Sequence, residues 1–295
     1  MADLLLGKGV VDRIAADLGP RIEALKSAGV QPTLALVRMG ERSDDLSYER
    51  TACKRAESLG IAVRSIVFGA AASQGELEAA LHTASNDAGI HGCLLFRPLP
   101  AHIDDARACA ALAASKDIDG ITLDSLASVF TDGSTGFPPA TAAACMEMLA
   151  CYDVPLEGKH VAVVGRSLVV GKPVSMMLLA KNATVTMCHS RTDDLAGVCR
   201  AADIVICATG RARMFGADYF SPGQTVLDVG INFDDEGNLC GDVDFDAAEP
   251  VVAAITPVPR GIGTVTTSVT MAHVVEAAER LLAAPSGGAV EGENR

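Results

Sequence analysis

The chain has 295 residues, enough for two domains, and 49% of them are hydrophobic. This apolar fraction excludes global disorder, and with 4% aromatic residues and no tryptophan the core must be aliphatic. The net charge of −13 argues against general binding to nucleic acid or to anionic membranes, because both would repel the chain.

The apolar periodicity of the first half alternates between helix and strand. It predicts helices at 8–28, 44–59, 73–88 and 104–114, and strands at 32–37, 61–68 and 90–96. We expect a break or kink near Gly19-Pro20, because proline removes a helical N–H. Ser73 and Glu76 have the spacing of a capping box. Such alternation is typical of βαβ units and a parallel sheet.

The second half repeats the alternation after a turn-rich segment at 131–139. The pattern predicts helices at 140–152, 173–182, 193–202 and 264–284, and strands at 161–164, 184–188, 203–208, 225–230 and 254–256. We expect the Gly- and Glu-rich tail, 285–295, to be disordered. The fold class predicted is therefore α/β with two domains.

The nine cysteines are scattered and form no Cys-x-x-Cys pair. This usage predicts a reducing, cytoplasmic compartment and no structural zinc or other metal site. The N-terminal sequence lacks the features of a signal peptide, and no apolar run approaches the ~18 residues that would span a membrane.

One strand-to-turn stretch has the features of a phosphate-binding site. The apolar strand 161–164 is followed by Gly165 and, six residues later, by Gly171, and Pro173 stands where a first helical turn would begin. Glycine lets a ligand approach the backbone, and a helix N-terminus offers free N–H groups. The spacing is not the usual Gly-x-Gly-x-x-Gly, so an ordinary strand-to-helix connection is the alternative to a dinucleotide site.

The end of the next strand bears on which nucleotide would bind. An acidic residue there selects NAD, whereas a basic residue accommodates the 2′-phosphate of NADP. Here Ser190 and Arg191 follow the strand with no acid before Asp193, and Arg166 could reach the same place. The alternative for Arg191 is a solvated loop charge. We favour NADP over NAD.

Several segments, in this order and spacing, carry a resemblance to a known family. They are Tyr48, 97–100, 116–120, 139–141, 165–173, 228–232, 241–244 and 256–263. Over nearly its full length the chain resembles the bifunctional methylenetetrahydrofolate dehydrogenase/methenyltetrahydrofolate cyclohydrolases.

The resemblance implies two α/β domains around a cleft and a homodimer. Residues 1–139 with 272–295 would form the folate-binding domain, and residues 140–271 a Rossmann-type, doubly wound NADP-binding domain. The implied reaction oxidises 5,10-methylenetetrahydrofolate by hydride transfer to NADP and then hydrolyses the methenyl product to 10-formyltetrahydrofolate.

The resemblance also implies roles for individual residues. Tyr48 would stack on the pterin, and Asp119 would accept paired hydrogen bonds from its amino-pyrimidine edge, although by itself Asp119 is more typical of a turn before Gly120. The other implied substrate-binding residues are Phe96, Pro98, Leu99, Pro257, Val258, Gly261 and Gly263. The implied cofactor-binding residues are Gly165, Arg166, Ser167, Val170, Gly171, Ser190, Arg191, Thr209 and Ile231.

The sequence departs from the family motif Tyr-x-x-x-Lys, whose lysine serves the hydrolysis step. Ala52 occupies that position, and Lys54, about 200° further around the helix, should face away. Arg55 shares the face of Tyr48 but cannot act as a base. The usual glutamine before the Leu-Pro-Leu-Pro segment is also replaced: Phe96 stands there, followed by Arg97. We expect an intact dehydrogenase step, with hydrolysis either weak or carried by Tyr48, Arg97 and Arg55.

The sequence leaves two other functions open. A shikimate-type dehydrogenase shares the two-domain plan, but the Ser-x-Ser segment and the lysine–aspartate pair that it would need are not found. A non-catalytic folate or nucleotide sensor could have kept the fold and lost the lysine. NADP reduction with methylenetetrahydrofolate separates these alternatives.

Overall fold

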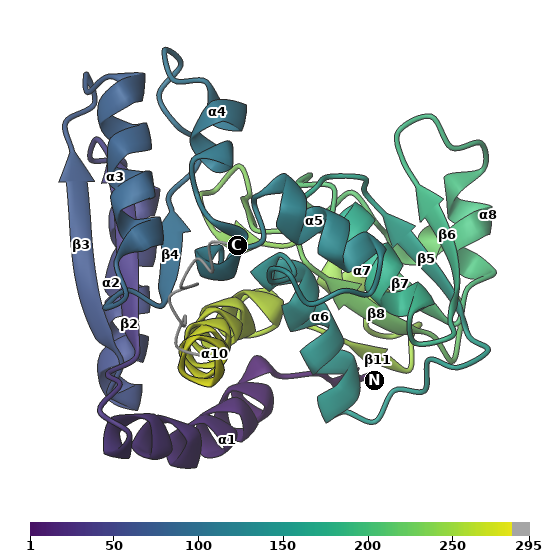
Figure 1. Ribbon diagram of the computed structural model, residues 1–295. Coiled ribbons are helices and arrows are strands. Elements are labelled where there is room, and N and C mark those ends of the chain that lie inside the picture. The colour runs from purple at the N-terminus through teal and green to yellow at the C-terminus, as the bar shows by residue number, and fades with distance from the viewer. Residues whose placement is uncertain (285–295) are drawn as a thin grey trace, which may run out of the picture.

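Two parallel sheets organise the chain (Figure 1). The computed structural model describes residues 1–284; the disorder predicted for 285–295 lies outside the described residues. The smaller sheet has the order β3-β2-β4 and the larger β1-β11-β8-β7-β5-β6, while β9 and β10 form an antiparallel pair. The strands are β1 (Asp3–Leu4), β2 (Thr33–Met39), β3 (Ala62–Phe68), β4 (Gly92–Leu95), β5 (His160–Val164), β6 (Thr184–Cys188), β7 (Ile204–Cys207), β8 (Thr225–Asp228), β9 (Asn232–Phe233), β10 (Leu239–Cys240) and β11 (Ala254–Ile255).

Helices connect and cover these strands, which confirms the predicted α/β class. The α-helices are α1 (Gly7–Ser27), α2 (Ser43–Leu59), α3 (Gln74–Asn86), α4 (Asp105–Ala110), α5 (Leu123–Phe130), α6 (Ala140–Cys151), α7 (Gly171–Leu179), α8 (Leu195–Arg200), α9 (Phe245–Ala248) and α10 (Ile262–Ala283). Two short 3-10 helices are η1 (Ala114–Lys116) and η2 (Ala217–Tyr219). Among the described residues, no helix is long and apolar enough to cross a membrane.

The large sheet has the strand order of a doubly wound nucleotide-binding domain. From the central strand β5 the chain moves outward to β6, and it then returns to the other side of β5 through β7 and β8. The order therefore reverses between β5 and β7, and ligands of such sheets bind outside the carboxyl ends of the strands at this point. β5 is Val-rich and buried along Val161–Val164, as expected of a central parallel strand.

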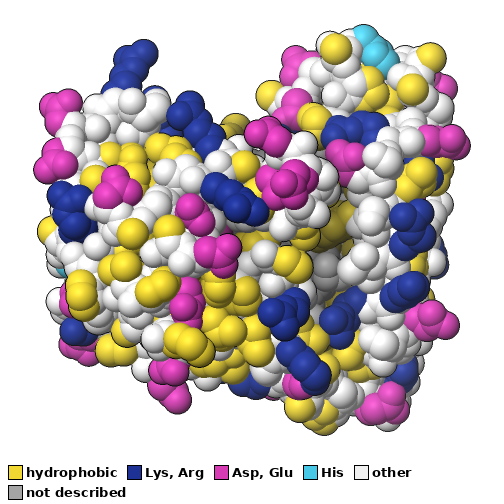
Figure 2. All heavy atoms as spheres, turned by 180° about the vertical axis from the view of Figure 1, so that it is seen from behind, with side chains coloured by type: hydrophobic (Ala, Val, Ile, Leu, Met, Phe, Trp, Pro, Cys, Tyr) yellow, Lys and Arg dark blue, Asp and Glu magenta, His cyan; other side chains and the backbone are white. Residues whose placement is uncertain are grey.

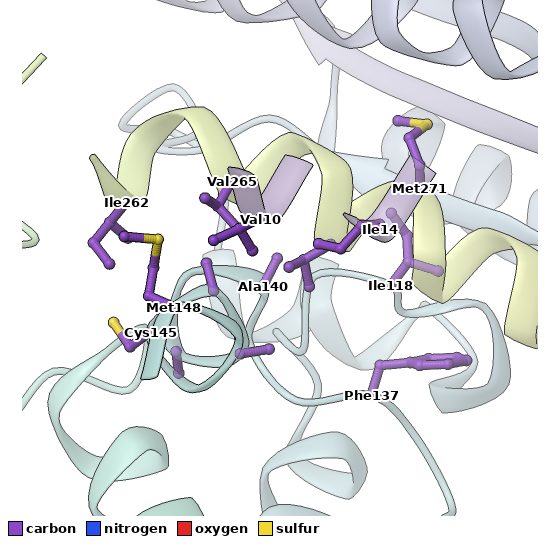
Figure 3. Close-up of a cluster of buried hydrophobic side chains, with 14 of the residues drawn as sticks. Val10, Ile14, Ile118, Phe137, Ala140, Cys145, Met148, Ile262, Val265 and Met271 are labelled. Carbon is purple, nitrogen blue, oxygen red and sulfur yellow. The ribbon is translucent and has the colours of Figure 1, made fainter. Parts of the chain in front are cut away.

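The part of the molecule built on the small sheet and the part built on the large sheet are called here the two lobes. Three helices pack between them. Side chains of α1, α6 and α10 meet in one apolar cluster, in which Val10, Ile14, Met148 and Val265 are buried (Figure 3). α10 returns from the large sheet and packs across α1, α6 and the small sheet, and its residues 265–271 are buried. The region between the lobes thus has a floor of packed helices.

The structure corrects two local predictions and adds a strand that was not predicted. α1 runs unbroken through Pro20, because Pro20 is exposed while the opposite face, including Leu18 and Ile22, is buried in the cluster. α7 begins at Gly171, two residues before Pro173, so that proline sits in its first turn. Residues 3–4 form β1, which pairs with β11 and joins the large sheet.

Candidate active site

The molecule is hollowed between its two lobes (Figure 2). A cavity of about 470 Å³, called here the first cavity, lies between α2, the end of β4, the start of α6 and the loop after β5. Tyr48, Phe96, Arg97 and Asp119 all line it, so four of the residues predicted from the sequence come together. The lining residues that the sequence analysis did not identify include Arg42, Asp44, Asp45, Leu126, Leu168, Val169 and Thr266.

Tyr48 presents an aromatic ring to this cavity. It packs edge-on against Phe96, with ring centroids 5.9 Å apart and planes at 80°. Burial raises the pKa of Tyr48 to about 12, and the nearby carboxyl of Asp119 adds to the effect. The hydroxyl therefore stays protonated at neutral pH and can donate a hydrogen bond, but it is not a base.

The carboxyl of Asp119 is an unusually weak acid. Burial raises its pKa to about 7, repulsion from Asp117 adds to this, and the nearby guanidinium of Arg97 opposes it. Such a group can become ionised when a cationic or multiply donating ligand binds beside it.

Asp117 fixes the loop that presents Asp119. Its buried carboxylate accepts hydrogen bonds from the N–H groups of Ile121 and Thr122, at 3.0 and 2.7 Å. Gly120 follows with φ of 65°, and a Cβ there would lie 2.4 Å from the nitrogen of Pro139. Within the Asp-Ile-Asp-Gly motif, Asp117 therefore stabilises the turn through its hydrogen bonds, and Asp119 lines the first cavity.

Arg97 lines the cavity, but its guanidinium is already paired. Both Nε and Nη2 donate to the carboxylate of Asp105, with the Nε bond at 2.8 Å. The next two residues leave the cavity wall: Pro98 is exposed, and Leu99 packs against the apolar cluster under the small sheet. The chain bends at residues 97–98, directly after Phe96, and only Phe96 and Arg97 of residues 96–99 line the first cavity.

Arg55 lines neither of the two cavities described for the cleft, and Lys54 is exposed. Arg55 lies seven residues beyond Tyr48, which displaces it ~10 Å along the helix axis and past the cavity. Ala52 is fully buried. The α2 helix thus brings none of its basic residues to the place where the family's lysine would lie.

A second cavity, of about 630 Å³, adjoins the first. Asp44 and Tyr48 line both cavities. The second is also lined by Ile231 and by the segment between β11 and α10, which brings together five further residues predicted from the sequence. They are Ile231, Pro257, Val258, Gly261 and Gly263.

The glycine-bounded turn lies at the point where the strand order reverses. A Cβ on Gly165 would lie 2.2 Å from the carbonyl oxygen of Ala208, and one on Gly171 would lie 2.1 Å from that of Gly165. Ser167 holds the turn, because the Val170 N–H donates to its hydroxyl at 3.1 Å. Only glycines permit this close packing, which holds the exposed residues 166–169 of the turn directly before the start of α7.

The basic residues of this region are exposed around the turn. Ser190 and Arg191 follow β6, whose last residue, Cys188, pairs with Val164 of β5. Arg166 is exposed within the turn itself. Cationic side chains from two adjacent strand ends thus flank a helix N-terminus, an arrangement suited to phosphate groups.

The buried carboxylates Asp228 and Asp242 organise the neighbouring loops. Asp242 accepts five hydrogen bonds, from the backbone and hydroxyl of Thr209, from the N–H groups of Gly210 and Arg211, and from the Asn232 amide. Asp228 accepts hydrogen bonds from the backbone N–H groups of Gly230, Asp242 and Val243. Both residues belong to motifs that resemble those of the family, but their role in the loops depends on contacts across the fold and cannot be predicted from the sequence.

Comparisons with known proteins agree with this architecture. A family model for the catalytic domain of tetrahydrofolate dehydrogenase/cyclohydrolase matches residues 5–119, and the model for its NAD(P)-binding domain matches residues 139–282. The bifunctional protein FolD of Carboxydothermus hydrogenoformans is 49% identical over 283 residues, which cover 95% of this chain and 99% of the relative.

Solved structures give the same result. The bifunctional FolD methylenetetrahydrofolate dehydrogenase/cyclohydrolase of Campylobacter jejuni has a TM-score of 0.92 and 34% identity, covering 95% of this chain and 99% of that chain. The FolD of Trypanosoma brucei, solved with NADP and an inhibitor, has a TM-score of 0.90 and 32% identity, covering 96% and 99%. The chain therefore belongs to the tetrahydrofolate dehydrogenase/cyclohydrolase family.

Proposed function

We propose that the protein oxidises 5,10-methylenetetrahydrofolate to the methenyl cation with NADP, and hydrolyses the cation to 10-formyltetrahydrofolate. The observation that carries this proposal is the meeting of two cavities at Tyr48. The substrate's one-carbon bridge joins the pterin to the aminobenzoyl group, so a pterin in the first cavity and an aminobenzoyl group in the second would hold the bridge beside Tyr48.

The first cavity suits a pterin. Its aromatic wall, Tyr48 with Phe96, matches a flat ring, and Asp119 offers two oxygens to the donors of an amino-pyrimidine edge. Ionisation of Asp119 would be favoured by these donors, because hydrogen bonding to the charged form lowers a carboxyl pKa. We assign pterin binding to both groups.

The Gly165–Gly171 turn suits a dinucleotide. The exposed turn residues Arg166 and Ser167 beside the start of α7, with the exposed Ser190 and Arg191 after β6, fit the phosphate groups of such a cofactor. When bound, NADP supplies the hydride acceptor. Thr209 and Ile231, just beyond the ends of β7 and β8, would position the nicotinamide. The proposed division into domains is 1–139 with 272–295 and 140–271, of which 285–295 lies outside the described residues.

The test is NADP reduction with methylenetetrahydrofolate, compared with shikimate and with no substrate. We expect reduction with the folate only. Formation of a methenyl absorbance without NADPH, or reduction with shikimate, would contradict the proposal, and absence of any turnover with retained folate binding would favour a sensor. A dehydrogenase without hydrolase activity is the second candidate, favoured by the fully buried Ala52.

We also propose that the chain forms a homodimer. β3 is an edge strand of the small sheet, and Val67 on it is 52% exposed. An uncovered edge can pair with a second copy, and charged side chains oppose such pairing. Light scattering should give twice the chain mass for the wild type and the single mass for Val67→Lys. A monomeric wild type would refute the proposal.

The compartment that we propose is the cytoplasm. All nine cysteines are free thiols, and seven of them are buried. Free buried thiols are typical of proteins that fold in a reducing compartment. Cell fractionation that recovers the protein outside the cytoplasm would contradict this assignment.

A further inference from the structure

Asp45 is a buried carboxylate that the proposed function does not use. It is the third residue of α2, it is 7% exposed, and it lines the first cavity. Tyr48 lies three residues later, so the two side chains share one face of the helix. No hydrogen bond among residues 1–284 reaches the Asp45 carboxylate. Among the described residues, the Asp45 oxygens are not enclosed atoms that lack a partner, so the carboxylate opens onto the first cavity, where a water can bind it.

The hydrolysis step needs a base that the family motif does not supply here. Ala52 replaces the lysine and is fully buried. Tyr48 keeps its proton, since its pKa is raised to about 12 by burial. Arg97 cannot give up a proton and is paired with Asp105. Asp119 is assigned to the pterin.

The neighbouring acid is also occupied. Asp44 accepts hydrogen bonds from Arg42, at 2.8 Å, and from the hydroxyl of Ser43. These bonds lower the pKa of Asp44, whereas burial raises that of Asp45, with Asp44 raising it and Arg42 and Arg38 opposing. Of the two carboxylates, Asp45 is therefore the stronger base and the one with oxygens free to bind water.

Asp45 is also close to the expected position of the reacting carbon. Asp44 and Tyr48 line both cavities, and Asp45 lies between them in the sequence on the first turns of α2. A substrate whose one-carbon bridge lies where the cavities meet would place that bridge along this part of the helix. A water on the Asp45 carboxylate would then stand beside the bridge.

We propose that Asp45 is the general base of the hydrolysis step; this inference rests on the proposed function. A water attacks the methenyl carbon, its oxygen forms the new C–O bond, and one of its protons passes to Asp45. The neutral hydroxylated intermediate then breaks its bond from carbon to N5. N5 takes the proton from Asp45, the hydroxyl releases its proton to solvent, and the carbon remains as a formyl group on N10.

The decisive variant is Asp45→Asn, which keeps the shape and removes the base. General-base help is worth about 10²–10⁴ in rate, so we expect enzyme-dependent decay of methenyltetrahydrofolate to fall ~100-fold or more. NADP reduction with methylenetetrahydrofolate should change less than about tenfold, because hydride transfer needs no base. If Asp45 only attracted the methenyl cation electrostatically, its loss would affect both hydride transfer and hydrolysis. Such a role would not slow hydrolysis alone.

Glu57→Gln is the matched control, because it removes a charge from an exposed position of the same helix outside both cavities. It should leave both rates unchanged. A second measurement uses Asp45→Gly, in which formate should restore hydrolysis in a concentration-dependent way. A purely structural role for Asp45 predicts no such rescue.

The outcomes separate this inference from the proposed function. A smaller loss of hydrolysis in Asp45→Asn, an equal loss of both steps, or no rescue by formate overturns the role of Asp45. So does a wild type that reduces NADP without speeding methenyltetrahydrofolate decay. Failure of the wild type to reduce NADP with methylenetetrahydrofolate refutes the proposed function itself.

Discussion

Replacing Asp119 with Asn should make the protein more stable and a poorer enzyme. The structure raises the pKa of this carboxyl from 3.8 to about 7, chiefly by burial. A tenfold change in an equilibrium constant is worth about 1.4 kcal/mol, so ionised Asp119 costs the folded state on the order of 4 kcal/mol. Part of the side chain faces the cavity, which makes this figure an upper limit.

Whether ionisation of Asp119 raises or lowers the free energy of unfolding depends on which state, folded or unfolded, binds the proton more tightly. Below pH 3.8 Asp119 is protonated in the folded and unfolded states, so its ionisation costs nothing there. The cost grows as the pH rises from 3.8 to about 7 and is complete above pH 7. The advantage of Asp119→Asn should therefore be about 2 kcal/mol at pH 5 and about 4 kcal/mol at pH 8.

Urea unfolding at pH 5 and pH 8 measures this difference, and steady-state kinetics measure its functional counterpart. Loss of a hydrogen-bonded charge is worth about 1.5–3 kcal/mol, so KM for the folate should rise about 10–150-fold. Asp124→Asn is the control, an exposed first-turn acid whose loss should cost less than about 1 kcal/mol. A variant less stable than wild type at pH 8, or a difference that is equal at both pH values, would refute the reasoning.

Three further changes probe the cofactor half of the site. Arg191→Ala should lower kcat/KM for NADP about 10–150-fold and leave that for NAD unchanged; an unaltered preference would show that Arg191 is only a solvated charge. Gly171→Ala would put a Cβ 2.1 Å from a backbone oxygen, so we expect a loss of about 1–3 kcal/mol in thermal unfolding and a raised KM for NADP; wild-type values would contradict the close packing. Asp242→Asn removes the charged acceptor of the Thr209 loop and should cost about 1.5–3 kcal/mol, again with weaker NADP binding; unchanged binding would separate that loop from the cofactor.

The sequence by itself determined what depends on neighbours along the chain. The Val161–Val164 strand, the turn between Gly165 and Gly171 and the helix start near Pro173 follow from local periodicity and backbone preference, and the structure confirms this order of elements. The alternation of strands and helices likewise predicted parallel sheets, because such connections require them.

Only the tertiary structure decided what depends on distant contacts. A break or kink was expected near Gly19-Pro20; the break is absent, because the opposite face of α1 packs against α6 and α10 along one helix from Gly7 to Ser27. The helical periodicity correctly places Arg55 on the same side of α2 as Tyr48. Arg55 nevertheless lies too far along the helix axis to line either cavity, because periodicity does not say how far a cavity extends along a helix.

The acidic residues show the same division most clearly. Asp117, Asp228 and Asp242 accept several backbone N–H groups, whereas Asp119 and Asp45 line the first cavity, although all five are short acids beside turns or helix starts. Which carboxylate is satisfied and which remains available depends on the atoms that surround it after folding. The sequence identified the phosphate turn and Asp119, whereas Asp45 became a candidate only when the lobes enclosed it beside Tyr48.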